Sequence, residues 1–171
     1  MKRIFITGIC GFVGSNLAIY FQSQGYKVYG IDNLSRKGTA KNFKALTKRN
    51  ILVYKKDLSQ LKKLNFIKKK LNFEALIHCA ALTSVLDGAN DNSEEFLYKN
   101  NVWSTFYALK ICKLIRSKFI YISSSRVYSI TEINKINFKI KQNYFFPKKT
   151  KLVGYSSKGI NENFSTTSPV S

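Results

Sequence analysis

Histidine and cysteine are scarce in this 171-residue chain, and their scarcity argues against two classes of site. There is one histidine, His78, and there are three cysteines, Cys10, Cys79 and Cys112, which show no Cys-x-x-Cys spacing. A zinc site would need an unusual ligand set, and any disulfide scheme would leave one cysteine unpaired. We therefore expect neither a metal site nor a disulfide framework.

Long apolar runs are also missing. No stretch of about 18 or more uncharged apolar residues occurs, which argues against a membrane span. The N-terminal MKRIFITG is basic and then apolar, but its apolar run is too short for a signal peptide and leads directly into a glycine-rich loop. We interpret it as a first strand and expect a cytoplasmic protein with no membrane partner.

Acidic residues number 9 against 29 lysines and arginines, which gives a formal net charge of +20. Such a charge attracts nucleic acid, anionic lipid or small anions. The basic residues are mostly lysines spread along the chain among Ile, Asn, Phe and Tyr, as is typical of a solvated surface. We therefore consider a nucleic-acid partner unlikely despite the charge.

Short apolar runs alternate with amphipathic stretches and predict the fold. The runs that predict strands are residues 3–7, 27–32, 51–55, 75–80 and 118–124. Their near-continuous apolar character is typical of strands buried on both faces of a parallel sheet. Helices are predicted over residues 61–71 and 93–115, from apolar positions three and four residues apart. The alternation predicts a doubly wound α/β sheet with right-handed crossovers.

The stretch 93–115 is apolar on more than one face, with Val102, Phe106 and Leu109 on one side and Trp103 and others on another. A helix apolar over so wide an arc is either sandwiched in the core or shared with a partner subunit, so a homodimer through this helix is one expectation. After Ser125 the pattern dissolves, and a loop-like stretch of that length suggests a sheet that is incomplete at its C-terminal side.

The segment TGICGFVGSN follows the first predicted strand and opens a helix. Its Gly8, Gly11 and Gly14 form G-x-x-G-x-x-G, in which glycine permits a tight turn and close approach of a pyrophosphate. Eighteen residues after Gly14, Asp32 ends the second strand, where it is placed to bind an adenosine ribose and repel a 2′-phosphate. This favours NAD over NADP. The adjacent Arg36 and Lys37 would soften the preference, and a simple turn at Asp32 is the alternative.

The motifs TGxxGFxG, DNLSRKG at 32–38 and DL at 57–58 resemble the extended short-chain dehydrogenase/reductase family of NAD-dependent sugar-nucleotide epimerases and dehydratases. The stretch IDNLSRKGTAKNF looks most like the CDP-paratose 2-epimerase (CDP-tyvelose epimerase) branch. The resemblance implies a Rossmann-like doubly wound parallel sheet, C-terminally incomplete, with residues 1–171 as the NAD-binding domain. A substrate-binding lobe would be absent.

The resemblance also implies which residues bind the cofactor. Asp57 would meet the adenine edge, and the HCAAL segment would pass close to the cofactor. Asn101 would support the active-site backbone, with a solvent-facing helix Asn as the alternative, whereas we interpret His78 as a half-buried strand histidine without a catalytic role. The predicted cofactor-binding set is Gly8, Gly11, Phe12, Val13, Gly14, Asp32, Asn33, Asp57, Leu58, Ala80, Ala81, Asn101 and Ser123.

The catalytic serine of the family corresponds to Ser124, in YISSSRVYS at the end of the fifth strand. Its hydroxyl would hold the sugar hydroxyl that is oxidised. Ser123 or Ser125 are alternatives for this role, and three serines at a strand end are also common turn formers.

The family's general base is a tyrosine followed four residues later by a lysine on one helix face. The lysine matters because an unperturbed tyrosine titrates near ~10. In YSSK, Lys158 lies only three residues after Tyr155 and glycines flank the segment, and Tyr128 has no lysine four positions later. We reject both. By the family's pattern the catalytic tyrosine would lie two positions past Ser171.

The activity implied is reversible hydride transfer between NAD and a nucleotide-sugar hydroxyl, as in an epimerase. We expect this chain to be an N-terminal fragment that binds NAD and is inactive alone. The alternatives are a fragment of a nucleotide-sugar 4,6-dehydratase, a non-catalytic NAD-binding module acting through a partner chain, and a basic nucleic-acid-binding protein.

Overall fold

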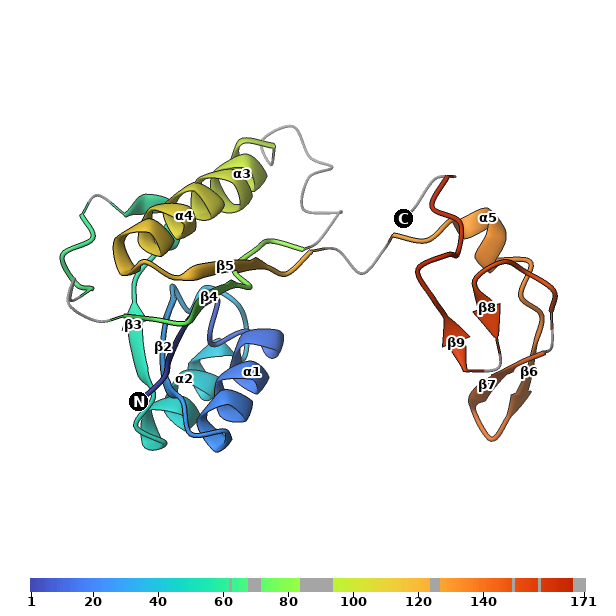
Figure 1. The fold of residues 1–171 in the computed structure, drawn as a ribbon, viewed down its shortest axis with the longest axis horizontal. Coiled ribbons are helices and arrows are strands. Elements are labelled where there is room, and N and C mark those ends of the chain that lie inside the picture. The colour runs from blue at the N-terminus through green and yellow to red at the C-terminus, as the bar shows by residue number, and fades with distance from the viewer. Residues whose placement is uncertain are drawn as a thin grey trace. The chain divides into compact units, whose positions relative to one another are not determined.

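The computed structural model describes residues 1–61, 63–67, 72–83, 94–123, 127–148, 150–156 and 158–167. These residues form two compact units, Met1–Ile122 and Ser123–Ser171. The first unit is a parallel sheet with helices on both faces (Figure 1). Among the described residues no helix is long and apolar enough to cross a membrane.

The sheet of the first unit has five parallel strands. They are β1 (Arg3–Thr7), β2 (Lys27–Asp32), β3 (Leu52–Lys55), β4 (Ala75–His78) and β5 (Lys118–Tyr121). Their spatial order is β3-β2-β1-β4-β5, so the order reverses at β1, which pairs with both β2 and β4. The predicted parallel doubly wound sheet is confirmed, with three of the strands shorter than predicted. A reversal of this kind opens a crevice at the carboxyl ends of the strands.

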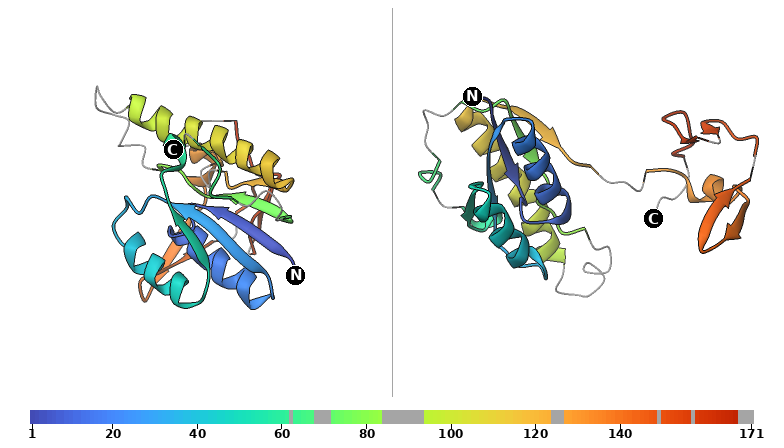
Figure 2. Two further views of the ribbon diagram at one scale, coloured as in Figure 1. Left: turned by 90° about the vertical axis from the view of Figure 1, so that its left-hand side faces the viewer. Right: turned by 90° about the horizontal axis from the view of Figure 1, so that it is seen from below.

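Helices cover both faces of the sheet, as the two further views also show (Figure 2). On one side lie α1 (Phe12–Ser23) and α2 (Thr39–Lys48). On the other lies a continuous helical stretch made of α3 (Glu94–Tyr98), a π-helical turn (Lys99–Trp103) and α4 (Ser104–Ile115). The helix predicted over 93–115 is therefore found from Glu94 onward.

The apolar strands contribute side chains to two separate cores, because alternate side chains point to opposite faces of the sheet. Ile4 and Ile6 of β1 pack with Leu46 of α2 in one core. Phe5 of β1 packs with Ile111 of α4 in the other. Burial on both faces explains why these strands lack the polar alternation of a half-exposed sheet.

The helix predicted over 61–71 is wrong in its described part. Leu61, Lys63 and Leu64 are not helical, and residues 65–67 form a turn after the short 3-10 helix Leu58–Gln60. Leu61 and Ile67 are nevertheless buried in the core that contains Phe5. The apolar spacing thus predicted burial correctly, but a segment this short has little helical stability of its own and reaches the core as a turn. Residues 62 and 68–71 lie outside the described residues.

The helix α4 is not sandwiched in the core. It buries Ser104, Ala108, Ile111, Cys112 and Ile115 against the sheet. The neighbouring apolar positions stay exposed, and these are Val102, Trp103, Phe106 and Leu109, each 42–47% exposed. The arrangement in which the helix is sandwiched in the core is therefore not found. The helix keeps an apolar face that nothing in the described first unit covers.

The second unit is made of small elements. It contains α5 (Ile130–Ile133), a hairpin of β6 (Phe138–Lys141) and β7 (Tyr144–Pro147), and a short pair of β8 (Tyr155–Ser156) and β9 (Gly159–Ile160). The hairpin turns through Gln142 and Asn143, both with positive φ, as a two-residue primed turn requires. Sequence reasoning missed this hairpin because Gln-Asn is a weak turn signal compared with Asn-Gly.

Candidate cofactor site

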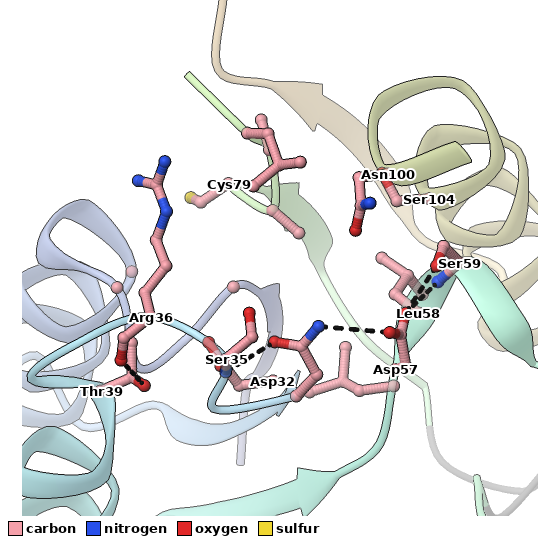
Figure 3. A pocket seen from close by; sticks show the side chains of 18 of the residues that line it. Asp32, Ser35, Arg36, Thr39, Asp57, Leu58, Ser59, Cys79, Asn100 and Ser104 are labelled. Atoms are coloured by element: carbon pink, nitrogen blue, oxygen red, sulfur yellow. Dashed lines mark hydrogen bonds between the residues drawn. The ribbon is translucent and has the colours of Figure 1, made fainter. Parts of the chain in front are cut away.

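A cavity opens at the carboxyl ends of β1, β2 and β4, where the strand order reverses (Figure 3). Most of the residues predicted to bind a cofactor line it. These are Gly8, Gly11, Phe12, Val13, Gly14, Asp32, Asn33, Asp57, Leu58, Ala80 and Ala81. Residues from β1, β2, β3 and β4 loops, distant in sequence, thus face one space.

At two of the loop glycines the neighbouring backbone leaves no room for a side chain. A Cβ on Gly14 would lie 2.2 Å from the Gly8 carbonyl oxygen, and one on Gly8 would lie 2.8 Å from the Ala80 nitrogen. Gly8 also has φ +64, which favours glycine. The helix α1 begins directly after Gly11 and no side chain caps it, so its first N–H groups and dipole are open to a phosphate. The residues present therefore fit a dinucleotide pyrophosphate.

Asp32 ties the glycine-rich loop to the end of β2. Its Oδ2 accepts a hydrogen bond from the Cys10 backbone N–H at 2.9 Å, and its Oδ1 accepts one from Leu34 N–H at 2.8 Å. Leu34 adopts a positive φ to make this turn. An ionised carboxylate has about four lone-pair sites, so acceptor capacity remains for two ribose hydroxyls.

Asp57 and Asn33 form a second polar group at the cavity. Asp57 Oδ1 accepts from the backbone N–H of Ser59 at 2.9 Å and from its hydroxyl at 2.7 Å, which caps the 3-10 helix. Asp57 Oδ2 accepts from Asn33 Nδ2 at 3.3 Å. These contacts hold Asp57 at the cavity beside the buried core residue Leu58.

Arg36 lies across the cavity from Asp57. Its Nη1 donates a long hydrogen bond of 3.5 Å to Thr83 Oγ1, on the segment that follows β4. Figure 3 shows the side chain rising from the β2 loop toward the segment of Cys79. Sequence reasoning treated Arg36 only as a modifier of cofactor preference, whereas the structure also makes it a link between two loops.

The cysteines near the cavity are not nucleophiles. Burial raises the pKa of the Cys79 thiol to about 11, and burial together with the Asp32 charge raises the pKa of Cys10 to about 12. Both thiols are therefore protonated at neutral pH, and a thiol attacks only as the thiolate. In the described part of the chain no three His, Cys, Asp or Glu side chains are grouped to hold a metal ion.

Asn101 and His78 lie behind the cavity wall. Asn101 Oδ1 accepts from Leu82 N–H at 2.8 Å and its Nδ2 donates to the Leu82 carbonyl at 3.1 Å, so it clamps backbone beside the cavity instead of facing solvent. The neighbouring Asn100 lines the cavity itself. His78 was predicted half-buried and is only 2% exposed, because the α3–α4 stretch covers the end of β4.

Ser124, the predicted catalytic residue, lies outside the described residues. Ser123, predicted to bind the cofactor, is exposed and begins the second unit. Tyr155 lies on the short strand β8, not on a helix, which agrees with the rejection of Tyr155 and Lys158 as a catalytic pair.

A Tyr-x-x-x-Lys spacing that sequence reasoning overlooked occurs at Tyr144 and Lys148. Tyr144 opens β7 and Lys148 follows that strand, and both are exposed. In a strand this spacing separates the two Cα atoms by about 13 Å, so Tyr144 and Lys148 do not share one face of a helix as the family's pair does. Spacing alone therefore does not identify the general base.

Comparison with known proteins shows the family to which this chain belongs. Residues 4–147 match the model of the NAD dependent epimerase/dehydratase family. The chain is 35% identical over 132 residues to the dTDP-D-glucose 4,6-dehydratase of Dictyostelium discoideum, covering 75% of this chain and 30% of that protein. It is 30% identical over 138 residues to the CDP-paratose 2-epimerase of Salmonella typhi, covering 79% of this chain and 40% of that protein.

The chain is also similar to a solved structure of an epimerase. A point mutant of the UDP-glucuronic acid 4-epimerase of Bacillus cereus, in complex with UDP-4-deoxy-4-fluoro-glucuronic acid and NAD, superposes with a TM-score of 0.62 at 26% identity. The match covers 74% of this chain and 41% of that one. The chain thus spans well under half the length of the relatives it matches. With the family model matching most of its length, the chain belongs to the NAD-dependent epimerase/dehydratase family, whose cofactor is NAD.

Proposed function

We propose that this chain is the cofactor-binding part of an NAD-dependent nucleotide-sugar epimerase. The observation that carries the proposal is the cavity where the uncapped start of α1, the Asp32 carboxylate and the 80–82 segment meet. Relatives that are epimerases of CDP- and UDP-linked sugars support the substrate class.

In this proposal each part of the chain has one task. NAD, when bound, supplies the hydride acceptor and donor. The glycine-rich loop binds the pyrophosphate, Asp32 binds the adenosine ribose, and Asp57 meets the adenine edge beside Leu58. Ser124 holds the sugar hydroxyl that an epimerase oxidises to a ketone and reduces again from the opposite face, with Ser123 as its neighbour at the cofactor.

We further propose that the chain does not turn over substrate alone. No Tyr-x-x-x-Lys pair lies on a helix in the described residues, and the matched relatives are more than twice as long as the matched segment. Loss of a general base costs about 10² to 10⁴ in rate, and loss of substrate contacts would lower it further. Activity would then need a second segment that supplies both.

A dehydratase is the second candidate. The 35% identity to a dTDP-D-glucose 4,6-dehydratase favours it, and the cofactor site would serve either reaction. The products separate the two, because a dehydratase releases a keto sugar with loss of water whereas an epimerase returns an isomer of equal mass.

The apolar face of α4 supports an assembly. Val102 and Trp103 of the π-helical turn form, with Phe106 and Leu109 of α4, an exposed apolar strip. We propose that a second copy of this chain covers the strip and forms a homodimer, since an isologous contact pairs the same patch on both copies. A non-catalytic module that acts through another chain would use the same strip.

Titration calorimetry of the purified chain tests the proposal. We expect NAD to bind more tightly than NADP and to remain bound at high salt. Equal affinity for both would contradict the role of Asp32. Failure to bind NAD, with oligonucleotide binding that weakens steeply with salt, would instead show a nucleic-acid-binding protein. Incubation with NAD and CDP- or UDP-sugars, followed by mass and NMR analysis, should show no product from the chain alone.

A further inference from the structure

A buried row of hydrogen bonds joins the wall of the cofactor cavity to the helix α4, and His78 lies at its centre. The His78 Nδ1 atom is 2.6 Å from Thr7 Oγ1, and its Nε2 atom is 3.1 Å from Thr105 Oγ1. The imidazole also lies against the rings of Phe119 and Tyr121, with centroids 6.0 and 5.5 Å away. Both ring nitrogens therefore form hydrogen bonds within the protein.

The partners of the two hydroxyl groups determine where the protons lie. Thr105 Oγ1 donates its proton to the Asn101 carbonyl at 2.7 Å, so toward the ring it accepts from Nε2–H. Thr7 Oγ1 accepts from the Ala80 N–H at 3.3 Å, which leaves its own proton for Nδ1. His78 is then neutral with its proton on Nε2, in agreement with burial, which lowers its pKa to about 4.

The network reaches the cavity wall at two points. At one end Ala80 N–H is held by Thr7, and at the other Asn101 holds both backbone groups of Leu82. Ala80 and Leu82 both line the cavity. Ala80 packs so closely on Gly8 that a Cβ added to Gly8 would lie 2.8 Å from the Ala80 backbone nitrogen. Movement of this wall would therefore change the cavity next to the glycine-rich loop.

Asn101 lies in the π-helical turn Lys99–Trp103 between α3 and α4. Single π-helical turns within α-helices occur frequently at functional sites. Here the turn carries both the carbonyl that accepts from Thr105 and the amide that clamps Leu82. The turn thus connects the histidine network to the wall.

We propose that His78 is a positioning residue for cofactor binding. As the neutral Nε2–H tautomer it couples Thr7 to Thr105 and holds residues 80–82 in the place that NAD requires. The proposal rests on NAD binding in this cavity, but its structural part can be tested on the protein without cofactor.

The tautomer is measured first. Because His78 is the only histidine in the sequence, labelling with ¹⁵N,¹³C-histidine gives the signals of one imidazole. The ring shifts should show a protonated Nε2 and an unprotonated Nδ1 at neutral pH. A protonated Nδ1, or rapid exchange between the two tautomers, would overturn the proposal.

Variants of Thr105 test the coupling to the wall. Thr105→Val removes the acceptor of Nε2–H and should weaken NAD binding about tenfold, with faster hydrogen exchange at the Ala80 and Leu82 amides. Thr105→Ser keeps the hydroxyl and should restore both. Thr47→Val is the matched control, because the Thr47 hydroxyl bonds only to carbonyls of its own helix α2.

The outcomes separate the two proposals. If the parent chain binds no NAD, the cofactor proposal fails, while the tautomer and the amide exchange still decide whether the network holds the wall. If Thr105→Val and Thr47→Val bind NAD within about twofold of each other, His78 does not position the wall for the cofactor.

Discussion

The Asp32 carboxylate accepts a hydrogen bond from the Cys10 backbone N–H at 2.9 Å, which ties the end of β2 to the glycine-rich loop after β1. The residue predicted to select the cofactor thus also shapes the loop predicted to bind its phosphates. Substitutions at Asp32 should therefore change both the affinity for NAD and the preference over NADP.

Asp32→Asn should weaken NAD binding about tenfold and reduce the preference for NAD over NADP, because it removes the charge that repels a 2′-phosphate. Calorimetric titration with both cofactors measures this. Glu162→Gln, an exposed change in the second unit, should leave both affinities unchanged. A preserved NAD preference in Asp32→Asn would show that the carboxylate does not face the ribose.

Gly14→Ala should destabilise the first unit by about 1–3 kcal/mol, because the added Cβ would lie 2.2 Å from the Gly8 carbonyl oxygen. At Gly11 the same atom would lie 3.2 Å from that oxygen, so Gly11→Ala should cost less. Urea unfolding of both variants gives the comparison. Equal stability losses would show that the loop relaxes around either methyl group.

Asn42→Asp should weaken NAD binding and lower stability by about 1–2 kcal/mol. Asn42 Nδ2 on α2 donates to the Cys10 carbonyl at 2.9 Å, and a carboxylate there would face that oxygen without a proton to share. The exposed neighbour Lys41 provides the control, as Lys41→Ala. Wild-type NAD affinity and stability in Asn42→Asp would show that α2 does not hold the loop.

Stability should fall as the pH drops from about 6.5 toward about 4, in part through His78. Burial lowers its pKa from 6.5 to about 4, so the unfolded chain takes up a proton in this window that the folded protein does not. The contribution is fully present above pH 6.5, and about 2 kcal/mol of it is lost by pH 5. Comparing urea unfolding of the parent and His78→Phe at pH 7 and 5 isolates this effect, since other groups titrate in both. If the free energy of unfolding changes equally with pH in the two proteins, His78 does not contribute to the pH dependence.

Phe106→Glu should convert a homodimer to a monomer, because it places a charge in the exposed strip of α4. Sedimentation velocity measures the change in mass. Lys113→Glu alters an exposed charged position on the same helix and should leave the dimer intact. If the parent chain is itself a monomer at high concentration, a second copy does not cover the strip.

The sequence alone determined the strand–helix alternation and the position of the glycine-rich loop after the first strand. Residues 3–7 and 27–32 are strands as predicted, because continuous burial leaves a local apolar signature. The three loop glycines and Asp32 were recognisable because turn geometry and pyrophosphate binding act over a few residues at fixed spacing.

Only the tertiary structure decided the features that depend on contacts between distant residues. The strand order, the link between Asn101 and Leu82, and the full burial of His78 arise where separate strands and helices meet. The turn at 65–67 shows that core packing can override a helical pattern, and the strand at Tyr144 shows that it can separate a pair that spacing alone would join. Local periodicity sets which side chains are buried, while packing between elements sets what they contact.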